Sequence, residues 1–305
     1  MSFSKKSSLS KDKIFQLTTR NVKIFIQMIE IFNKSADEIT IILKPKTTTR
    51  NGCFIASGIG GQRTVFIELI IGSCNFSEFI INDNAKDSDL KIGLNVSLLC
   101  DAIKDNDKDS FLTIYKCFDD EKIHIISERL GFKDTTRVPI LNDADYETIS
   151  EKAKLGVNIS FSISFLEFKK FMKKLSIASS GSVEITTTFH QLKFSTSNET
   201  GVKKELEGFF NHEFNKKKIK GKVKPRQNGS CLTINSISRE FSTNENFIIT
   251  NTYLLGSLKL IEKCKDIFEK IEIFYGNKSS LIANLYAEND ISASFIVGSI
   301  GDKDT

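Results

Sequence analysis

Short apolar runs alternate with polar turns along most of the chain. β-Branched and aromatic residues dominate these runs, as they do in strands that form a pleated, half-buried surface. The hairpin signal is strongest where only residues 119–121 separate two such runs. The pattern predicts strands at residues 39–43, 64–71, 111–118, 122–127, 156–164, 183–188, 230–237, 247–250, 281–286 and 291–297.

Four other segments repeat apolar residues with the i, i+3, i+4, i+7 spacing of an amphipathic helix. Helices are expected to begin near residues 21, 94, 164 and 251. The third is the clearest, because lysines occupy the face opposite its apolar stripe. The stripes consist of Val22, Phe25, Ile26 and Ile29; Val96, Leu99, Cys100 and Ile103; Phe168, Phe171, Met172 and Leu175; and Leu254, Leu258 and Ile261.

The order of strands and helices in the first half is repeated in the second half. The second and fourth helices also share the short pattern Asn-x-x-Leu-Leu, at residues 95–99 and 251–255. This repetition predicts an α+β chain with two similar tandem domains, each mostly antiparallel sheet with two amphipathic helices. We expect the domains at residues 14–137 and 157–301, a polar and acidic connector at 138–156, and a disordered Ser/Lys-rich extension at 1–13.

The 305-residue chain has a net charge of +5, and the excess lies in its second half. Residues 1–150 contain 20 Lys+Arg and 21 Asp+Glu, whereas residues 151–305 contain 23 and 17. Seven of the latter cations form one basic loop, which Gly221 and Pro225 predict to be mobile. This loop either binds nucleic acid or an acidic partner, serves as a nuclear address, or is simply solvated. Its cations are Lys216, Lys217, Lys218, Lys220, Lys222, Lys224 and Arg226.

No constellation typical of an enzyme stands out in the sequence. The six cysteines and three histidines are scattered without metal-ligand spacing, so we expect no metal, disulfide or cofactor. Asp105-x-Asp107-x-Asp109 begins like a calcium loop, but Ser110 replaces the required glycine. The glycine-rich stretch at 58–61 precedes a strand rather than a helix, so it lacks the helix N-terminus of a phosphate site.

No targeting or membrane segment is predicted either. No apolar run reaches the roughly 20 residues that span a bilayer. The polar N-terminus does not resemble a secretory signal. We therefore expect an intracellular protein without a membrane partner.

The order of four segments along the chain resembles one known family. A strand ending in Gly-x-Asn leads into a helix ending in lysine within LKIGLNVSLLCDAIKD, residues 90–105. A strand and a helix with a Glu-Phe pair and spaced basic residues follow within ISFSISFLEFKKFMKKLS, residues 159–176. A Tyr-Leu helix lies within NTYLLGSLKLIEK, residues 251–263, and a final strand with a short acidic end forms SASFIVGSIGDKDT. This order and spacing, from about Leu17 to Asp304, resemble the DNA sliding clamps of the proliferating cell nuclear antigen family.

The resemblance implies a non-enzymatic subunit, expected to form a homotrimeric ring around double-stranded DNA. As a processivity factor it would tether a DNA polymerase and other replication and repair proteins, without reading sequence. Its helices would line the ring. The residues that match the family's basic positions, with their neighbours, are Lys170, Lys173, Lys104, Lys259, Lys169, Lys174, Lys263 and Lys23.

The alternative is that these lysines are merely solvated on the polar faces of their helices. The first half also departs from the family's pattern. Asp101 stands where the family often has a basic residue, and the first helix carries only Lys23, with Glu30 beyond it.

The resemblance also implies a groove that binds short peptides with apolar anchors. The matching residues would be Val65, Ile67, Ile149, Ile296, Val297 and Gly298. Alternatively, Val65 and Ile67 point into the sheet.

Two rival functions remain open from the sequence. The first is a clamp-fold transcription or accessory factor that does not close a ring, and the second is a metal-dependent nucleic-acid enzyme. The high Ile, Lys, Asn and Phe content suggests an AT-rich genome, so a divergent viral clamp in the nucleus or a cytoplasmic replication compartment is expected.

Overall fold

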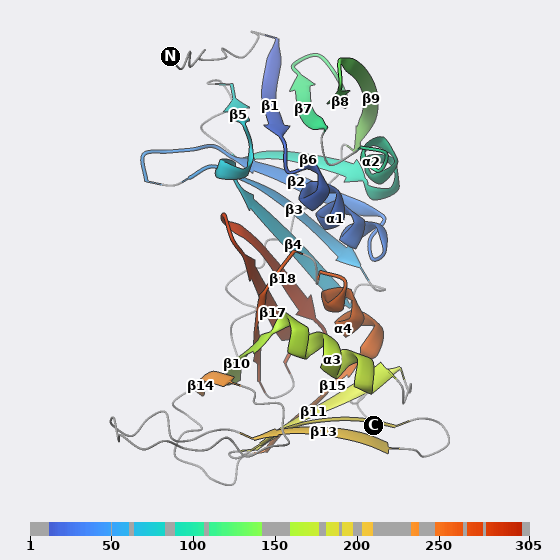
Figure 1. Cartoon of the computed structure of the whole chain (residues 1–305), viewed down its shortest axis with the longest axis vertical. Coiled ribbons are helices and arrows are strands. Elements are labelled where there is room, and N and C mark those ends of the chain that lie inside the picture. Colours follow the sequence, from blue (N-terminus) through green and yellow to red (C-terminus); the bar gives the residue numbers. More distant parts are fainter. Residues whose placement is uncertain are drawn as a thin grey trace. The chain divides into compact units, whose positions relative to one another are not determined.

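The computed structural model describes residues 12–49, 51–60, 64–82, 89–106, 110–141, 159–176, 181–188, 191–197, 203–209, 233–237, 248–264, 267–276 and 279–300. Its helices are α1 (Val22–Asn33), η1 (Ser73–Asn75, a 3-10 turn), α2 (Val96–Ile103), α3 (Phe165–Ser176) and α4 (Leu255–Glu262) (Figure 1). The strands are β1 (Lys13–Thr19), β2 (Glu38–Lys44), β3 (Cys53–Gly60), β4 (Val65–Gly72), β5 (Glu78–Ile81), β6 (Leu90–Asn95), β7 (Phe111–Cys117), β8 (Lys122–Arg129), β9 (Phe132–Leu141), β10 (Ile159–Ser164), β11 (Ser182–Thr188), β12 (Gln191–Ser197), β13 (Lys203–Phe209), β14 (Thr233–Ile237), β15 (Ile248–Leu254), β16 (Lys270–Tyr275), β17 (Leu281–Ala287) and β18 (Ile291–Val297).

The chain forms two compact units, and unit 1 comprises Met1–Gly60, Ile67–Glu147 and Glu288–Ser292. Its strands follow the antiparallel order β3-β2-β6-β9-β8-β7-β1-β5. Helices α1 and α2 pack against each other. Helix α1 is anchored by Phe25, whose ring meets Phe54 of β3 edge to face at 5.3 Å. Helix α2 begins after Asn95, because the side chain of Asn95 accepts a hydrogen bond from the Leu98 N–H at 3.0 Å.

Unit 2 comprises Gly61–Phe66, Thr148–Ala287 and Ala293–Thr305. Its strands include the antiparallel sets β14-β10-β16-β17 and β13-β12-β11-β15. Helices α3 and α4 pack against each other. The Phe171 ring of α3 meets Phe194 of β12 edge to face at 4.3 Å, which fixes the helix on the second of these sheets.

Unit 1 is completed by a turn that lies late in the sequence. Asn289 and Asp290 both adopt positive φ angles, 60° and 57°, as the central residues of a tight hairpin turn do. The Gly72 N–H donates to the Asp290 carbonyl at 2.9 Å, and the Asn75 side chain donates to the Asn289 carbonyl at 2.5 Å. A Cβ on Gly72 would lie 2.6 Å from the Asp290 Cβ, so this approach requires glycine.

The structure confirms the predicted hairpin and the four helices. Strands β7 and β8 pair from Phe111↔Glu128 to Tyr115↔His124. The predicted start of the fourth helix, near residue 251, was wrong, because β15 continues to Leu254 and pairs there with Ser182 of β11. All predicted stripe residues are buried except two. The exceptions are Ile26 of α1 and Leu254 of β15, which are half-buried.

The strand expected to end in Gly-x-Asn is β6, whereas several other strands were not predicted from the sequence, namely β1, β3, β5, β9, β12, β13 and β16. Strand β9 continues to Leu141, so the first four residues assigned to the connector belong to a strand. The rest of the predicted connector, to residue 156, and the predicted N-terminal extension up to residue 11 lie outside the described residues.

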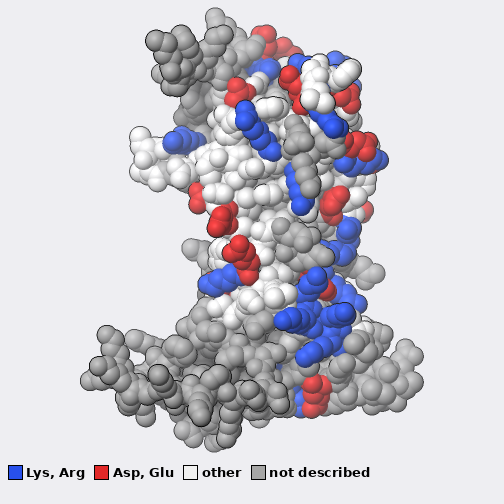
Figure 2. Space-filling view, viewed as in Figure 1, with Lys and Arg blue, Asp and Glu red and all other residues white. Residues whose placement is uncertain are grey.

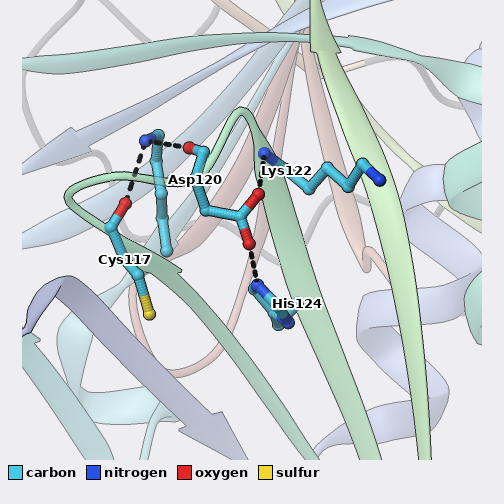
Figure 3. A network of polar contacts seen from close by, with 5 residues as sticks. Cys117, Asp120, Lys122 and His124 are labelled. Atoms are coloured by element: carbon cyan, nitrogen blue, oxygen red, sulfur yellow. Dashed lines mark hydrogen bonds and ion pairs between the residues drawn. The ribbon is translucent and has the colours of Figure 1, made fainter.

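The turn between β7 and β8 is held by a polar network (Figure 3). The carboxylate of Asp120 contacts the His124 Nε2 at 2.5 Å and accepts a hydrogen bond from the Lys122 N–H at 3.0 Å. The Lys116 ammonium donates to the Asp120 carbonyl at 2.6 Å, and the His124 ring stacks on Tyr115 with centroids 4.7 Å apart. The hydrogen bond from His124 is the main cause that lowers the pKa of Asp120.

Replacing Asn75 by alanine should destabilise unit 1. The buried Asn75 side chain donates to the carbonyls of Gly72 and Asn289, which would both lose a partner. We expect the free energy of unfolding to fall by about 1–3 kcal/mol, measured by urea denaturation. Asn33→Ala is the matched control, because Asn33 is exposed and should change stability by less than about 0.5 kcal/mol. Equal losses in the two variants would contradict the role given to Asn75.

Replacing Asp120 by asparagine should make stability less dependent on acid. A carboxylate whose pKa is lowered on folding stabilises the protein above its unfolded pKa, near 3.8, and loses this contribution as the pH falls through the lower folded value. Wild type should therefore melt at a higher temperature than Asp120→Asn at pH 7, and the difference should shrink below about pH 4. A melting difference that stays constant down to pH 2 would argue against the Asp120–His124 contact.

Candidate nucleic-acid interface

Helix α3 presents a row of cations because its apolar stripe fixes its rotation. Phe168, Phe171, Met172 and Leu175 are all buried, with at most 8% of any side chain exposed. Residues three and four positions apart share one side of a helix, so the lysines between these stripe residues face away from the sheet. Lys170, Lys173 and Lys174 are exposed and Lys169 is half-buried, and none of the described α3 side chains is acidic.

Helix α4 packs against α3 and adds two of the predicted lysines. Its buried Leu258 and Ile261 anchor one side, which leaves Lys259 half-buried and Lys263 exposed. The half-buried Glu262 is the acidic residue of this helix. The α3–α4 pair therefore carries a clear excess of positive charge.

The helices of unit 1 present a different surface. Lys23 of α1 is exposed, but so is Glu30 on the same helix. Lys104 caps the C-terminus of α2, where its ammonium contacts the Asp101 carboxylate at 2.9 Å. This hydrogen bond raises the pKa of Lys104, and the pair offsets the charge of both groups. The α1–α2 face is therefore close to neutral.

This contrast is visible on the molecular surface. Figure 2 shows Lys and Arg side chains gathered over α3 and α4, whereas Asp and Glu side chains alternate with them over α1 and α2. Anions that bind through net charge would therefore favour the α3–α4 face.

The sequence reasoning missed one cation on the helical faces. Lys34 is the C-terminal cap of α1, and its side chain is exposed. It lies one residue beyond the helix, so the helical spacing that identified the other lysines did not include it. The basic loop at residues 216–226 lies outside the described residues.

The structure corrects the predicted peptide groove in part. Val65, Ile67 and Val297 are at most 1% exposed, so their side chains cannot line an accessible surface. Alternation explains this, because residues two apart on a strand share a face, and here the apolar face is covered. Ile296 and Gly298 are partly exposed and stay candidates, whereas Ile149 lies outside the described residues.

Other sequence motifs now have structural positions. Gly58 and Gly60 lie inside β3, and a Cβ on Gly60 would overlap the Ser35 carbonyl, so Gly60 is a packing residue. Within the described ranges, no group of three His, Cys, Asp or Glu residues is placed to hold a metal ion. Asp107 and Asp109 lie outside those ranges.

Burial raises the pKa of the Cys100 thiol to about 11. None of the helices described here has the length and apolar character to cross a bilayer.

Solved structures identify this arrangement of strands and helices. A crystal structure of the PCNA2–PCNA3 complex from Sulfolobus tokodaii matches with a TM-score of 0.69 and 15% identity, over 93% of this chain and 99% of that chain. The proliferating cellular nuclear antigen of Entamoeba histolytica matches with a TM-score of 0.70 and 14% identity, over 95% and 100%. The chain has the PCNA clamp fold.

The match to solved PCNA structures confirms the predicted α+β clamp fold and the resemblance that the order of segments indicated. The match covers nearly the full length of both chains, so it includes both units and not one domain alone. No protein-family model matches the sequence, and no curated protein matches it. At 14–15% identity the likeness establishes the PCNA fold, and function must be argued from the chain's own residues.

Proposed function

We propose that the protein is a DNA sliding clamp, in which several copies close a ring around duplex DNA and tether other proteins to it. The observation that carries this proposal is the lysine row of α3, fixed on the exposed side of a helix by a buried apolar stripe. The PCNA fold supports it.

The chemistry of α3 suits a protein that must hold DNA and still move along it. Lysine ammonium groups attract phosphates by charge and release counterions from the DNA. Phosphate contacts carry no sequence information, so such a surface binds every sequence alike. Lys170 and Lys173 are our first candidates for these contacts, followed by Lys259.

The neutral α1–α2 face makes the proposed DNA contact uneven. Lys104 is engaged by Asp101, and Glu30 opposes Lys23 on α1. The α3–α4 pair of each subunit would therefore supply most of the attraction to phosphate. In a ring, the basic face would be repeated once in every subunit.

Two strand edges that have no partner among the described strands support assembly into a ring. Residues Phe132 to Val138 of β9 pair with β8 on one side, while β6 pairs only with Ile140 and Leu141. Strand β13 ends its sheet and pairs with β12 alone among the described strands. An unpaired edge readily accepts a strand from another chain. Two different edges on one chain allow a head-to-tail contact that closes into a ring.

Tethering would use short peptides with apolar anchors. With Val65, Ile67 and Val297 buried, the partly exposed Ile296 and Gly298 are the described residues still available for this contact. A DNA polymerase is the expected partner, because a tether that slides increases the length copied in each binding event.

A ring makes two measurable predictions about the wild-type protein. Its mass in solution should be a multiple of 34.3 kDa, with three copies expected. Once on DNA, it should stay on a nicked circle and be lost when that circle is cut, because a ring slides off an end. A protein that is monomeric at every concentration, or that leaves circular and linear DNA at the same rate, would instead favour an accessory factor that forms no ring.

The double variant Lys170→Glu/Lys173→Glu should bind DNA weakly. Both changes replace attraction to phosphate with repulsion at exposed positions, so folding should be preserved. We expect affinity to fall by at least ~10-fold at low salt, with a shallower dependence of binding on salt. The measurement is a fluorescence-anisotropy titration with duplexes of two unrelated sequences.

The matched control is Lys46→Glu/Lys122→Glu, which changes the net charge equally at two exposed positions outside the helices. It should bind DNA nearly as well as wild type. Equal losses in the two double variants would show that net charge, and not the α3 face, governs binding.

A further inference from the structure

A small cavity of about 160 Å³ lies in unit 1 beside strand β5. Its lining residues are Pro45, Lys46, Phe79, Ile80 and Ile81. Strand β5 supplies the last three, and the chain just after β2 supplies the first two. Neighbouring residues of a strand point to opposite faces, so a cavity lined by three successive residues lies along the edge of β5 and not on one face of its sheet.

This edge of β5 has backbone groups to offer. Strand β5 is the last strand of its sheet, and β1 is its one partner among the described strands (Figure 1). The Asn82 N–H donates to the Ile14 carbonyl of β1 at 2.8 Å. Successive residues of an antiparallel strand direct their N–H and C=O groups to alternate sides, so those of Phe79 and Ile81 point away from β1. They match the donors and acceptors that an added strand needs.

The apolar wall of the cavity is held in place by a chain of aromatic rings. Phe79 meets Phe76 edge to face at 5.5 Å, and Phe76 in turn lies 6.3 Å from the buried Phe54. Pro45 and Ile81 are buried as well. Walls that are formed before binding reduce the free energy spent on ordering the site. The cavity is therefore suited to receive a side chain as it stands.

Size and charge define what the cavity can hold. A cavity of ~150 Å³ accommodates benzene, so this one has room for a single ring or branched aliphatic side chain. Lys46 is the charged residue of the lining, and it is exposed. It forms no ion pair with the part of the chain that the structure describes, whereas Lys44, two residues earlier, contacts Asp89 at 3.8 Å. The rim of the cavity therefore attracts a carboxylate.

We propose that the β5 edge binds an extended acidic segment of a partner protein, which adds to the sheet as a further strand. The segment would pair with the backbone of Phe79 and Ile81, place one apolar side chain in the cavity and bring a carboxylate to Lys46. Ile296 and Gly298, the residues proposed for tethering, belong to unit 2. The β5 edge is thus a second docking site, and it does not depend on ring formation.

A second copy of this chain suits the edge less well than an acidic partner. Two β5 edges paired with each other would bring a second Lys46 to the contact, with no carboxylate in the lining to balance either cation. The chain's own residues 1–11 are the other occupant within reach, because they lead into β1, where the Lys13 carbonyl accepts from the Asn82 side chain at 3.2 Å. That segment contains lysines and no acidic residue, so it also lacks the complementary charge.

A random dodecapeptide library displayed on phage, selected on the wild-type protein without DNA, tests the site. Selected peptides should combine a carboxylate with β-branched or aromatic residues. Their affinity, measured by fluorescence anisotropy, should fall at least ~5-fold in Lys46→Glu and at least ~10-fold in Phe79→Ala. A saturating peptide should also slow amide hydrogen exchange at Phe79 and Ile81, measured by NMR, by at least ~10-fold, because only strand pairing covers these N–H groups.

Lys122→Glu is the matched control, because it makes the same change at an exposed lysine that does not line the cavity. It should bind the selected peptides within ~2-fold of wild type. Circular dichroism verifies the fold of each variant, and Lys46→Glu, at an exposed position, still decides the matter if Phe79→Ala does not fold.

Three results would overturn the proposal. The first is a library from which no peptide distinguishes wild type from Lys46→Glu, or whose peptides leave exchange at Phe79 and Ile81 unchanged. The second is peptide binding only after residues 1–11 are removed, which would make that segment the occupant. The third is a lower mass in solution for Lys46→Glu than for wild type, which would make a second copy the occupant. The first two leave the proposed ring and its DNA contact untouched, since neither is measured through assembly or DNA.

Discussion

Burial of the apolar stripe on each helix sets the direction of every charged side chain that the proposed function uses. Burying one large apolar side chain contributes about 1.5–3 kcal/mol, whereas an exposed ion pair contributes at most about 1 kcal/mol. The rotation of α3 is thus decided by Phe168, Phe171, Met172 and Leu175, and its lysines follow. Charge on the exposed side can differ between the two halves at little cost to the fold, and here it does.

The sequence predicted most reliably what depends on local periodicity. Helix spacing identified four helices and their buried sides, because an apolar stripe of three or four residues at helical spacing favours one buried side. Residues 119–121 identified the β7–β8 hairpin, because a short polar break between two apolar runs leaves few alternatives. The order of these elements was enough to indicate the clamp fold, although identity to solved PCNA structures is only 14–15%.

Properties set by distant contacts could not be predicted. The sequence showed that Val65 and Ile67 share a face of β4, but not that this face is covered. Strand β9 is polar from Lys133 to Arg137 and lacks the pattern of a half-buried strand. The structure also has a groove lined by Asp101 of α2 and Phe132 of β9, which only the packing of α2 on β8 and β9 brings together.

The turn at Asn289–Asp290 has a consequence for how the chain is made. A ribosome delivers the N-terminal residues first, yet the Asn75 side chain obtains a hydrogen-bond partner, the Asn289 carbonyl, from 214 residues further along the chain. Unit 1 therefore stays unfinished until Asn289 and Asp290 have been made. Folding is thereby coupled between the halves in time, so that a prematurely stopped chain leaves the early part incomplete as well.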